Sequence, residues 1–156
     1  MFRVLFVCSG NTCRSPMAEM ILRHLLEAKG LAEKIAVQSA GVHALDSDDM
    51  SVNAKRVLEK YAVNISVFSA KRLDKSIVEK NDLILCVTKE HVVAVNTFFS
   101  EFMEKTYLLG GFAGCGSGVA DPFGLDDKEY EECFLQLKLL IEKALPKIIS
   151  LTKEKG

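Results

Sequence analysis

The sequence lacks an excess of either sign of charge. It contains 20 Lys and Arg residues against 21 Asp and Glu residues, which gives a net charge of −1. Proteins that bind nucleic acids or anionic membranes through charge carry a clear positive excess, so we expect neither kind of partner. No apolar run approaches the roughly 20 residues that a transmembrane helix needs.

The sequence also lacks paired cysteines. Its five cysteines contain no Cys-x-x-Cys unit and are Cys8, Cys13, Cys86, Cys115 and Cys133. An odd number without such pairs argues against a disulfide framework and against a zinc site. The first residues contain a single Arg3 and no small-residue cleavage site, so we predict no signal peptide and expect a cytoplasmic protein.

Short apolar runs alternate with amphipathic segments along the chain. Strands are predicted at residues 3–7, 35–39, 82–87 and 106–110. Helices are predicted at 15–29, around 54–61, at 73–80, at 88–99 and from about Asp127 onward. This alternation indicates an α/β fold with a parallel sheet. A length of 156 residues, without repeats or linkers, predicts one domain over residues 1–156.

Three sequence signals mark where the helices begin and end. Ser15 and Pro16 are expected to be the N-cap and the first position of a helix that Gly30 ends. Pro146 is expected to kink or end the last helix. A polar loop is predicted at 42–50 and a glycine-rich loop at 110–118.

The loop at residues 8–15 connects the first predicted strand to a helix. Ligands of parallel sheets bind beyond the carboxyl ends of the strands, and a helix N-terminus favours an anion. Gly10 and Asn11 tolerate the left-handed backbone conformation, which lets successive N–H groups point inward. Arg14 provides a fork of donors for two phosphate oxygens. The loop is therefore predicted to bind phosphate.

A cysteine and a carboxylic acid complete this predicted chemistry. The field of the loop is expected to lower the pKa of Cys8 and to favour a nucleophilic thiolate. The pair Cys8 and Arg14 alone is weak evidence, and the Gly-Asn within the loop and the Ser-Pro after it make the signal specific. The leaving group needs a proton, and Asp121 is the candidate donor, although Asp-Pro alone indicates only a turn.

Together these residues resemble the low-molecular-weight protein phosphatase family. The resemblance covers essentially the whole chain and is carried by VLFVCSGNTCRSPMAE at 4–19, SAGV at 39–42 and DPFG at 121–124. It implies a single three-layer domain with a four-stranded parallel sheet flanked by helices on both faces. It also implies phosphorylated protein substrates and a reaction without metal or cofactor.

The same resemblance assigns the site residues. Cys8 would be the nucleophile that forms a phosphocysteine, Arg14 would bind the phosphate, and Asp121 would be the general acid and then the base. The phosphate-binding loop would consist of Ser9, Gly10, Asn11, Thr12, Cys13, Arg14 and Ser15. Asn11, Ser15 and Ser39 would form the hydrogen-bond network that supports it. Family members often have a supporting histidine where this chain has Phe68.

Two positions bear on the substrate. Tyrosine phosphatases of this type usually have Ile or Leu where this chain has Thr12, and a tyrosine pair where it has Phe123 and Gly124. In these features the chain looks like the bacterial protein-arginine phosphatases. Phosphoarginine is therefore the favoured substrate, and phosphotyrosine is the alternative.

Other interpretations stay open at this stage. A thioredoxin-coupled arsenate reductase would need further cysteines near the third strand, where only Cys86 lies. A catalytically idle phosphoprotein-binding module would not need Cys8, Arg14 and Asp121 together. Cys13 is either a buried filler or the partner of Cys8 in a reversible, protective disulfide.

The three histidines have no metal-ligand spacing. His24, His43 and His91 are scattered along the sequence and receive no catalytic role. His43 and Leu45 lie on the predicted loop at 42–50, which either is simply solvated or forms a wall of the substrate cleft.

Overall fold

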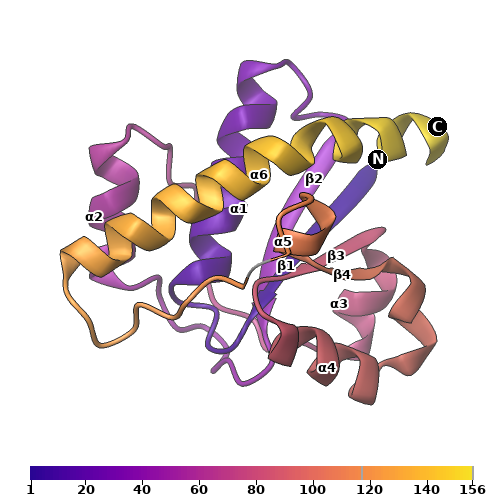
Figure 1. Ribbon diagram of the computed structural model, residues 1–156, viewed down its shortest axis with the longest axis horizontal. Coiled ribbons are helices and arrows are strands. Elements are labelled where there is room, and N and C mark those ends of the chain that lie inside the picture. Colours follow the sequence, from indigo (N-terminus) through magenta and orange to yellow (C-terminus); the bar gives the residue numbers. More distant parts are fainter. Residues whose placement is uncertain (117, 156) are drawn as a thin grey trace.

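Four short apolar strands form a parallel sheet in the computed structural model, which describes residues 1–116 and 118–155. The strands are β1 (Phe2–Cys8), β2 (Ile35–Gly41), β3 (Leu83–Cys86) and β4 (Thr106–Leu108). Their order in the sheet is β2-β1-β3-β4 (Figure 1). The predicted four-stranded parallel sheet is confirmed, and each strand matches a predicted one within a few residues.

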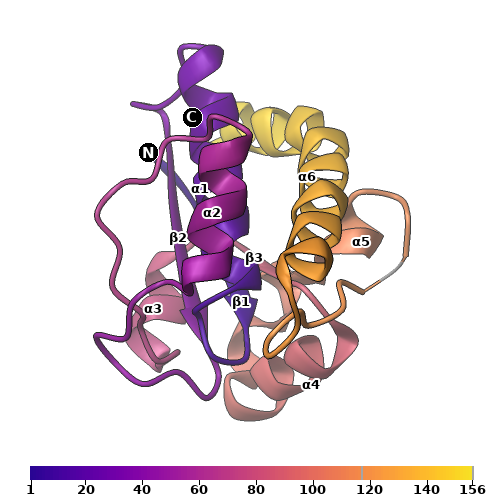
Figure 2. The ribbon, with the colours of Figure 1, turned by 90° about the vertical axis from the view of Figure 1, so that its left-hand side faces the viewer.

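Helices cover both faces of the sheet. One face carries α1 (Arg14–Ala28), α2 (Val52–Lys60), α5 (Leu109–Phe112) and α6 (Asp127–Lys155). The other face carries α3 (Lys75–Lys80), α4 (Lys89–Phe98) and the 3-10 helix η1 (Ser100–Lys105). Figure 2 shows the sheet between α6 on one side and α3 on the other. The fold is therefore the predicted three-layer α/β domain.

The central strand β1 is buried on both faces, which explains its unbroken apolar sequence. Val4 and Phe6 point into the core formed with α1, α2 and α6. Leu5 and Val7 point into the smaller core formed with α3 and α4. Because side chains alternate along a strand, this run places Cys8 on the face of α1, at the carboxyl end of the sheet.

The structure differs from the sequence predictions at several element ends. Cys13, not Ser15, is the N-cap of α1, because the Ser15 hydroxyl is used inside the loop. The fourth strand ends at Leu108, and the first part of the predicted 110–118 loop is the short helix α5. Position 117 of that loop lies outside the described residues.

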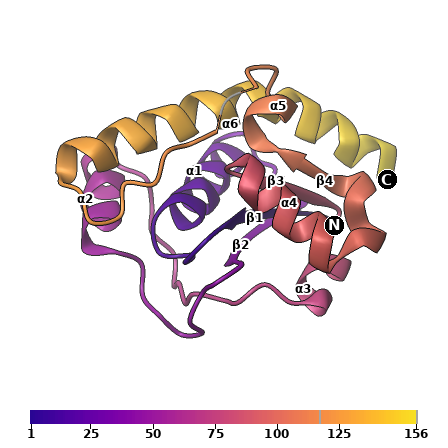
Figure 3. The ribbon, with the colours of Figure 1, turned by 60° about the horizontal axis from the view of Figure 1, so that its bottom comes forward.

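The last helix continues through Pro146 to Lys155, so the proline does not end it. Figure 3 shows that the axis of α6 curves along its length, as expected for a helix that loses one hydrogen bond at a proline. Within residues 1–116 and 118–155, no helix has both the length and the apolar character that crossing a membrane requires.

Candidate active site

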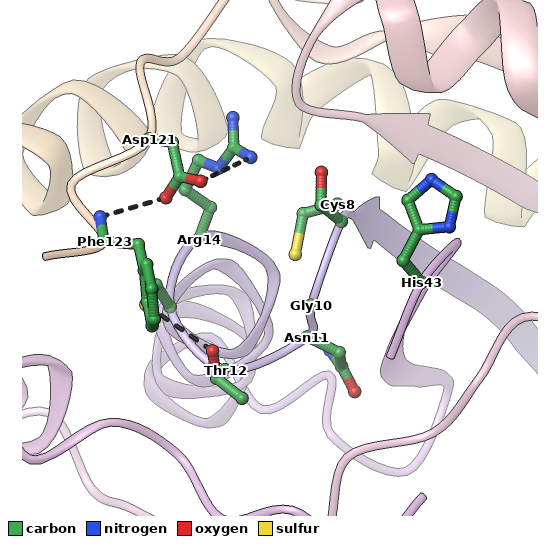
Figure 4. Close-up of a pocket in the computed structure, with 10 residues that line it drawn as sticks. Cys8, Gly10, Asn11, Thr12, Arg14, His43, Asp121 and Phe123 are labelled. Carbon is green, nitrogen blue, oxygen red and sulfur yellow. Dashed lines mark hydrogen bonds and ion pairs between the residues drawn. The ribbon is translucent and has the colours of Figure 1, made fainter. Parts of the chain in front are cut away.

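A cavity of about 260 Å³ opens at the carboxyl end of β1. Its lining comes from the loop after β1, the loop after β2 and the segment before α6, and consists of Cys8, Ser9, Gly10, Asn11, Thr12, Cys13, Arg14, His43, Asp121 and Phe123. Figure 4 shows Arg14, Asp121 and Phe123 together on one side of the cavity and His43 on the other side of Cys8. All three predicted catalytic residues therefore line one cavity.

The loop at 8–15 has one left-handed residue. Asn11 has a φ of 54°, as the sequence predicts. Gly10 lies outside the left-handed region, so the conformational freedom expected of this glycine is not used here. A single left-handed residue at position 11 is sufficient to turn the chain from β1 into α1.

Backbone hydrogen bonds fix the orientation of the loop peptides. The carbonyl oxygen of Cys8 accepts the N–H of Val42 at 3.0 Å, and that of Ser9 accepts the N–H of His43 at 2.9 Å. In a planar trans peptide the N–H points opposite to the carbonyl. The N–H groups of Ser9 and Gly10 therefore point away from the 42–43 segment, toward the side on which an anion would bind.

Gly41 allows this close packing of β2 against the loop. A Cβ atom at position 41 would lie 2.4 Å from the carbonyl oxygen of Ser9 and 2.9 Å from the amide nitrogen of Asn11. Neither backbone atom has room to move without breaking the loop geometry. The glycine in the SAGV motif is therefore required by contact with the loop.

The Asn11 side chain is the centre of a buried hydrogen-bond network. Its amide nitrogen donates to Ser15 Oγ at 2.8 Å and to Ser39 Oγ at 2.9 Å. Its Oδ1 accepts the backbone N–H of Lys71 at 3.0 Å. The Lys71 peptide thus supplies the support for which the sequence offers no histidine, while Phe68 packs, half-buried, against the core.

A buried carboxylate extends this network beneath the loop. Ser39 donates to Glu19 Oε1 at 2.6 Å, and Arg23 Nη2 lies 2.9 Å from Glu19 Oε2. Burial raises the pKa of Glu19, whereas the Ser39 hydroxyl and the Arg23 charge lower it. Glu19 was missed by the sequence analysis, since an acidic residue in a helix is ordinarily exposed.

The directions of the hydrogen bonds in this network determine how Ser15 contacts Cys8. Ser15 Oγ accepts a hydrogen bond from the Asn11 side-chain N–H, so its own hydroxyl is free to donate to Cys8 Sγ, 2.7 Å away. Burial raises the pKa of Cys8, while the hydrogen bonds from Ser15, the charge of Arg14 and the backbone N–H of Asn11 lower it. The net direction is upward, so the expectation of a lowered pKa is wrong, because it omitted the cost of burying a thiolate at the end of a core strand.

Arg14 and Asp121 meet across the mouth of the cavity. Arg14 Nη1 donates to the carbonyl oxygen of Val119 at 2.9 Å, and Nη2 lies 3.5 Å from Asp121 Oδ2. The other carboxylate oxygen accepts the backbone N–H of Phe123 at 3.1 Å. The Asp121 side chain is 49% exposed, so it remains accessible to a molecule entering the cavity.

Of the other cysteines, Cys13 also lines the cavity, whereas Cys86 lies within the sheet. Cys13 Sγ is buried and lies 3.3 Å from Tyr130 Oη and 3.7 Å from Ser51 Oγ. A disulfide between Cys13 and Cys8 stays a prediction. Cys86 is fully buried in β3, and burial raises its pKa to about 12, which suits a core residue better than a redox cysteine.

Two histidines belong to the site; the sequence analysis gave His43 as one of two possible wall residues of the cleft and gave His91 no role. His43 lines the cavity, whereas its neighbour Leu45 is exposed and lies outside the lining, so only one of the two residues forms a wall. His91 is buried at the start of α4, with Nε2 2.8 Å from Ser9 Oγ. The sequence feature that could have identified His91 is its position one turn after the Thr88 cap, at a strand-to-helix junction beside the loop.

Comparison with known proteins agrees with this geometry. A protein-arginine-phosphatase from Geobacillus stearothermophilus is 36% identical over 148 residues, which cover 94% of this chain and 96% of the relative. The solved structure of an arginine phosphatase from that organism has a TM-score of 0.88 at 34% identity, covering 100% of this chain and 98% of the other. A low-molecular-weight protein tyrosine phosphatase from T. tengcongensis has a TM-score of 0.89 at 35% identity, covering 94% and 99%.

The match to a whole family is equally extensive. The family described as low molecular weight phosphotyrosine protein phosphatase matches residues 3–155, from the start of β1 to the end of α6. Its match includes the loop around Cys8, the Gly41 contact and the Asp121 segment. This chain therefore belongs to the low-molecular-weight phosphotyrosine protein phosphatase family and is an enzyme of that family.

Proposed function

We propose that this enzyme removes phosphate from phosphoarginine side chains of proteins through a phosphocysteine intermediate. Cys8 is the nucleophile, Arg14 and the loop N–H groups bind the phosphoryl oxygens, and Asp121 transfers protons. The observation that carries the proposal is that Cys8, Arg14, Asp121 and the polar side chain of Thr12 all line one cavity.

The first step forms the intermediate. The Cys8 thiolate attacks phosphorus, a new S–P bond forms, and the P–N bond to the arginine side chain breaks with its electron pair on nitrogen. Asp121, in its carboxylic acid form, gives that nitrogen a proton, so the arginine side chain leaves as a guanidinium and Asp121 becomes a carboxylate. Ser15, Arg14 and the loop amides stabilise the thiolate against the cost of its burial.

The second step releases phosphate. The Asp121 carboxylate takes a proton from a water molecule as that water attacks phosphorus, and the S–P bond breaks. The Cys8 thiolate and inorganic phosphate are the products, and Asp121 is again protonated. The half-exposed position of Asp121 beside the Arg14 guanidinium is compatible with both roles.

The preference for arginine rests on the polarity of the cavity wall. The guanidinium of phosphoarginine carries several N–H donors, and burying a donor without a partner costs about 1–3 kcal/mol. The hydroxyl of Thr12 can accept from such a donor, whereas an isoleucine cannot. The relatives named protein-arginine-phosphatase support this assignment, although the tyrosine phosphatase from T. tengcongensis is as similar in fold.

Phosphotyrosine is the second candidate substrate because Phe123 also lines the cavity. Its ring is exposed and can pack against a phenyl group. The test is kcat/KM on two peptides of one sequence that carry phosphoarginine or phosphotyrosine. A higher value for phosphoarginine is expected, and a higher value for phosphotyrosine would replace this proposal with the tyrosine phosphatase assignment.

The proposed reaction takes place on proteins and within one domain. We expect phosphorylated proteins of the cytoplasm as substrates. We also expect residues 1–156 to act as one phosphatase domain that needs no metal or cofactor.

A further inference from the structure

A second cavity, of about 340 Å³, opens beside the catalytic cavity, and we call it the side groove. His43 lines both cavities, and Figure 4 shows this residue on the side of Cys8 away from Arg14 and Asp121. The apolar lining of the side groove comes from α4, the segment before α3 and the loop after β2, and consists of Val42, Leu73, Ala94, Phe98 and Phe99. The two cavities are therefore neighbours that share one wall.

Backbone hydrogen bonds and the smaller core hold most of the side groove in place. The N–H of Val42 donates to the carbonyl oxygen of Cys8 at 3.0 Å, and the N–H of Leu73 donates to that of Gly41 at 2.9 Å. Leu73 is buried in the core beneath α3 and α4, and Val42 and Phe99 pack, half-buried, against the same core. The side groove is thus formed in advance, so that a bound group pays little for ordering the protein.

Phe98 is the wall of the side groove that nothing in the chain covers. Its side chain is 75% exposed, although it lies at the end of a helix that packs on the core. A single exposed apolar residue is ordinary, but this ring borders a cavity whose other walls are mostly apolar. Among the described residues that line the side groove, Arg72 alone carries a formal charge. The groove therefore suits an uncharged, apolar group.

The substrate itself is the molecule that must pass over this region. When a phosphorylated side chain enters the catalytic cavity, the neighbouring residues of the same polypeptide lie on the rim of that cavity. The side groove begins at this rim, at His43. Alternate residues of an extended chain point to the same side and lie about 6.6–6.8 Å apart. A side chain two positions from the phosphorylated residue can therefore enter a cavity that a single side chain separates from the first.

We propose that the side groove binds an apolar side chain of the substrate protein, about two residues from the phosphorylated residue. This inference rests on the proposed function in one respect, that the substrate is a phosphorylated protein, and not on which residue carries the phosphate. An apolar side chain in the groove removes its own surface and part of the Phe98 ring from water. The contact is the same before and during the reaction, so it should lower KM and leave kcat unchanged.

The test uses peptides of serine and glycine that carry one phosphoarginine and one leucine, with the leucine moved through successive positions on either side. The reference peptide has serine in place of the leucine. At the favoured position, leucine should raise kcat/KM by about 10-fold through a lower KM. A second set of peptides, with phosphotyrosine in place of phosphoarginine, should favour leucine at the same position.

Two variants change the side groove without touching the lining of the catalytic cavity. Phe98→Ala removes the exposed wall, and Ala94→Gln places a polar amide in the groove. In each variant the ratio of kcat/KM for the leucine peptide to that for the serine peptide should fall close to one. Val93→Ala is the matched control, because Val93 is 63% exposed on the same helix and lies outside the groove lining, so its ratio should equal that of the parent.

The outcomes separate the side groove from the proposed function. A parent enzyme that prefers phosphoarginine but gains nothing from leucine at any position would overturn the role of the groove alone. A leucine effect that persists in both Phe98→Ala and Ala94→Gln would overturn it as well. A parent that prefers phosphotyrosine, with a leucine effect that both variants lose, would overturn only the choice of phosphoarginine. Sedimentation of a dimer that Phe98→Ala dissociates would identify a second copy of the chain as the occupant and contradict the assignment to the substrate.

Discussion

The Arg14 guanidinium lies 3.5 Å from the Asp121 carboxylate and joins the phosphate loop to the segment before α6. Arg14 is almost fully buried, while Asp121 is half exposed. An ion pair with one exposed partner adds little stability. Its effect here is positional, because it holds the proposed acid over the loop that is proposed to bind the phosphoryl group.

Replacing Asp121 by asparagine should therefore affect proton transfer more than binding. We expect Asp121→Asn to slow hydrolysis of substrates with poor leaving groups by about 10²–10⁴-fold, the range of general acid catalysis. Activated aryl phosphates, which need less protonation, should lose much less in the phosphocysteine-forming step. Burst kinetics on both substrate types measure this, and equal losses would exclude Asp121 as the acid.

Cys8→Ser should reduce turnover to the level of a reaction without enzyme. A serine hydroxyl is not ionised near neutral pH, so it cannot replace the thiolate as nucleophile. The fold and the binding of inorganic phosphate should be retained, because Arg14 and the loop N–H groups remain. Circular dichroism and phosphate titration are the controls, and sustained turnover by this variant would contradict the phosphocysteine mechanism.

Ser15→Ala should make the Cys8 thiol less acidic. The Ser15 hydroxyl lowers the pKa of Cys8, so its removal raises that pKa and reduces the thiolate fraction at neutral pH. The pH dependence of alkylation by iodoacetamide should move to higher pH. Ser51→Ala is the control, because Ser51 contacts Cys13 rather than Cys8; an unmoved profile in Ser15→Ala would show that this hydroxyl does not stabilise the thiolate.

Gly41→Ala should destabilise the protein by about 1–3 kcal/mol, as other overpacked positions do. The new Cβ would lie 2.4 Å from the carbonyl oxygen of Ser9, and only a shift of the loop can relieve that contact. Urea unfolding measures the effect. Gly111→Ala is the matched control, because its nearest neighbour lies at 3.8 Å and little change is expected; similar stability of both variants would contradict the tight packing under the loop.

The sequence was informative where one local pattern determines one structural outcome. The four apolar runs predicted the sheet, and the loop motif and the Asp-Pro segment predicted the three proposed catalytic residues, all of which line the cavity. The prediction that Ser15 is the N-cap of α1 was wrong because a hydroxyl has several possible partners. Here the Ser15 hydroxyl contacts Cys8 and Asn11 instead of capping the helix. The predicted direction of the Cys8 pKa shift was wrong because burial, its main cause, depends on elements far along the chain.

The residues missed by sequence reasoning are those whose roles arise from tertiary contacts. Glu19 and His91 occupy helix positions that look ordinary in the sequence. Only the folded chain brings Glu19 to Ser39 and His91 to Ser9. The support of Asn11 comes from a backbone N–H at Lys71, which no side-chain pattern can reveal.

The most direct test of the account is the ratio of kcat/KM for phosphoarginine to kcat/KM for phosphotyrosine, measured on the parent enzyme and on Thr12→Ile. An isoleucine would leave a guanidinium donor unpaired at a cost of about 1–3 kcal/mol, which corresponds to roughly 5- to 150-fold in rate. We expect the parent to prefer phosphoarginine and Thr12→Ile to reverse or flatten that preference. A parent that prefers phosphotyrosine, or a ratio that Thr12→Ile leaves unchanged, would contradict the account.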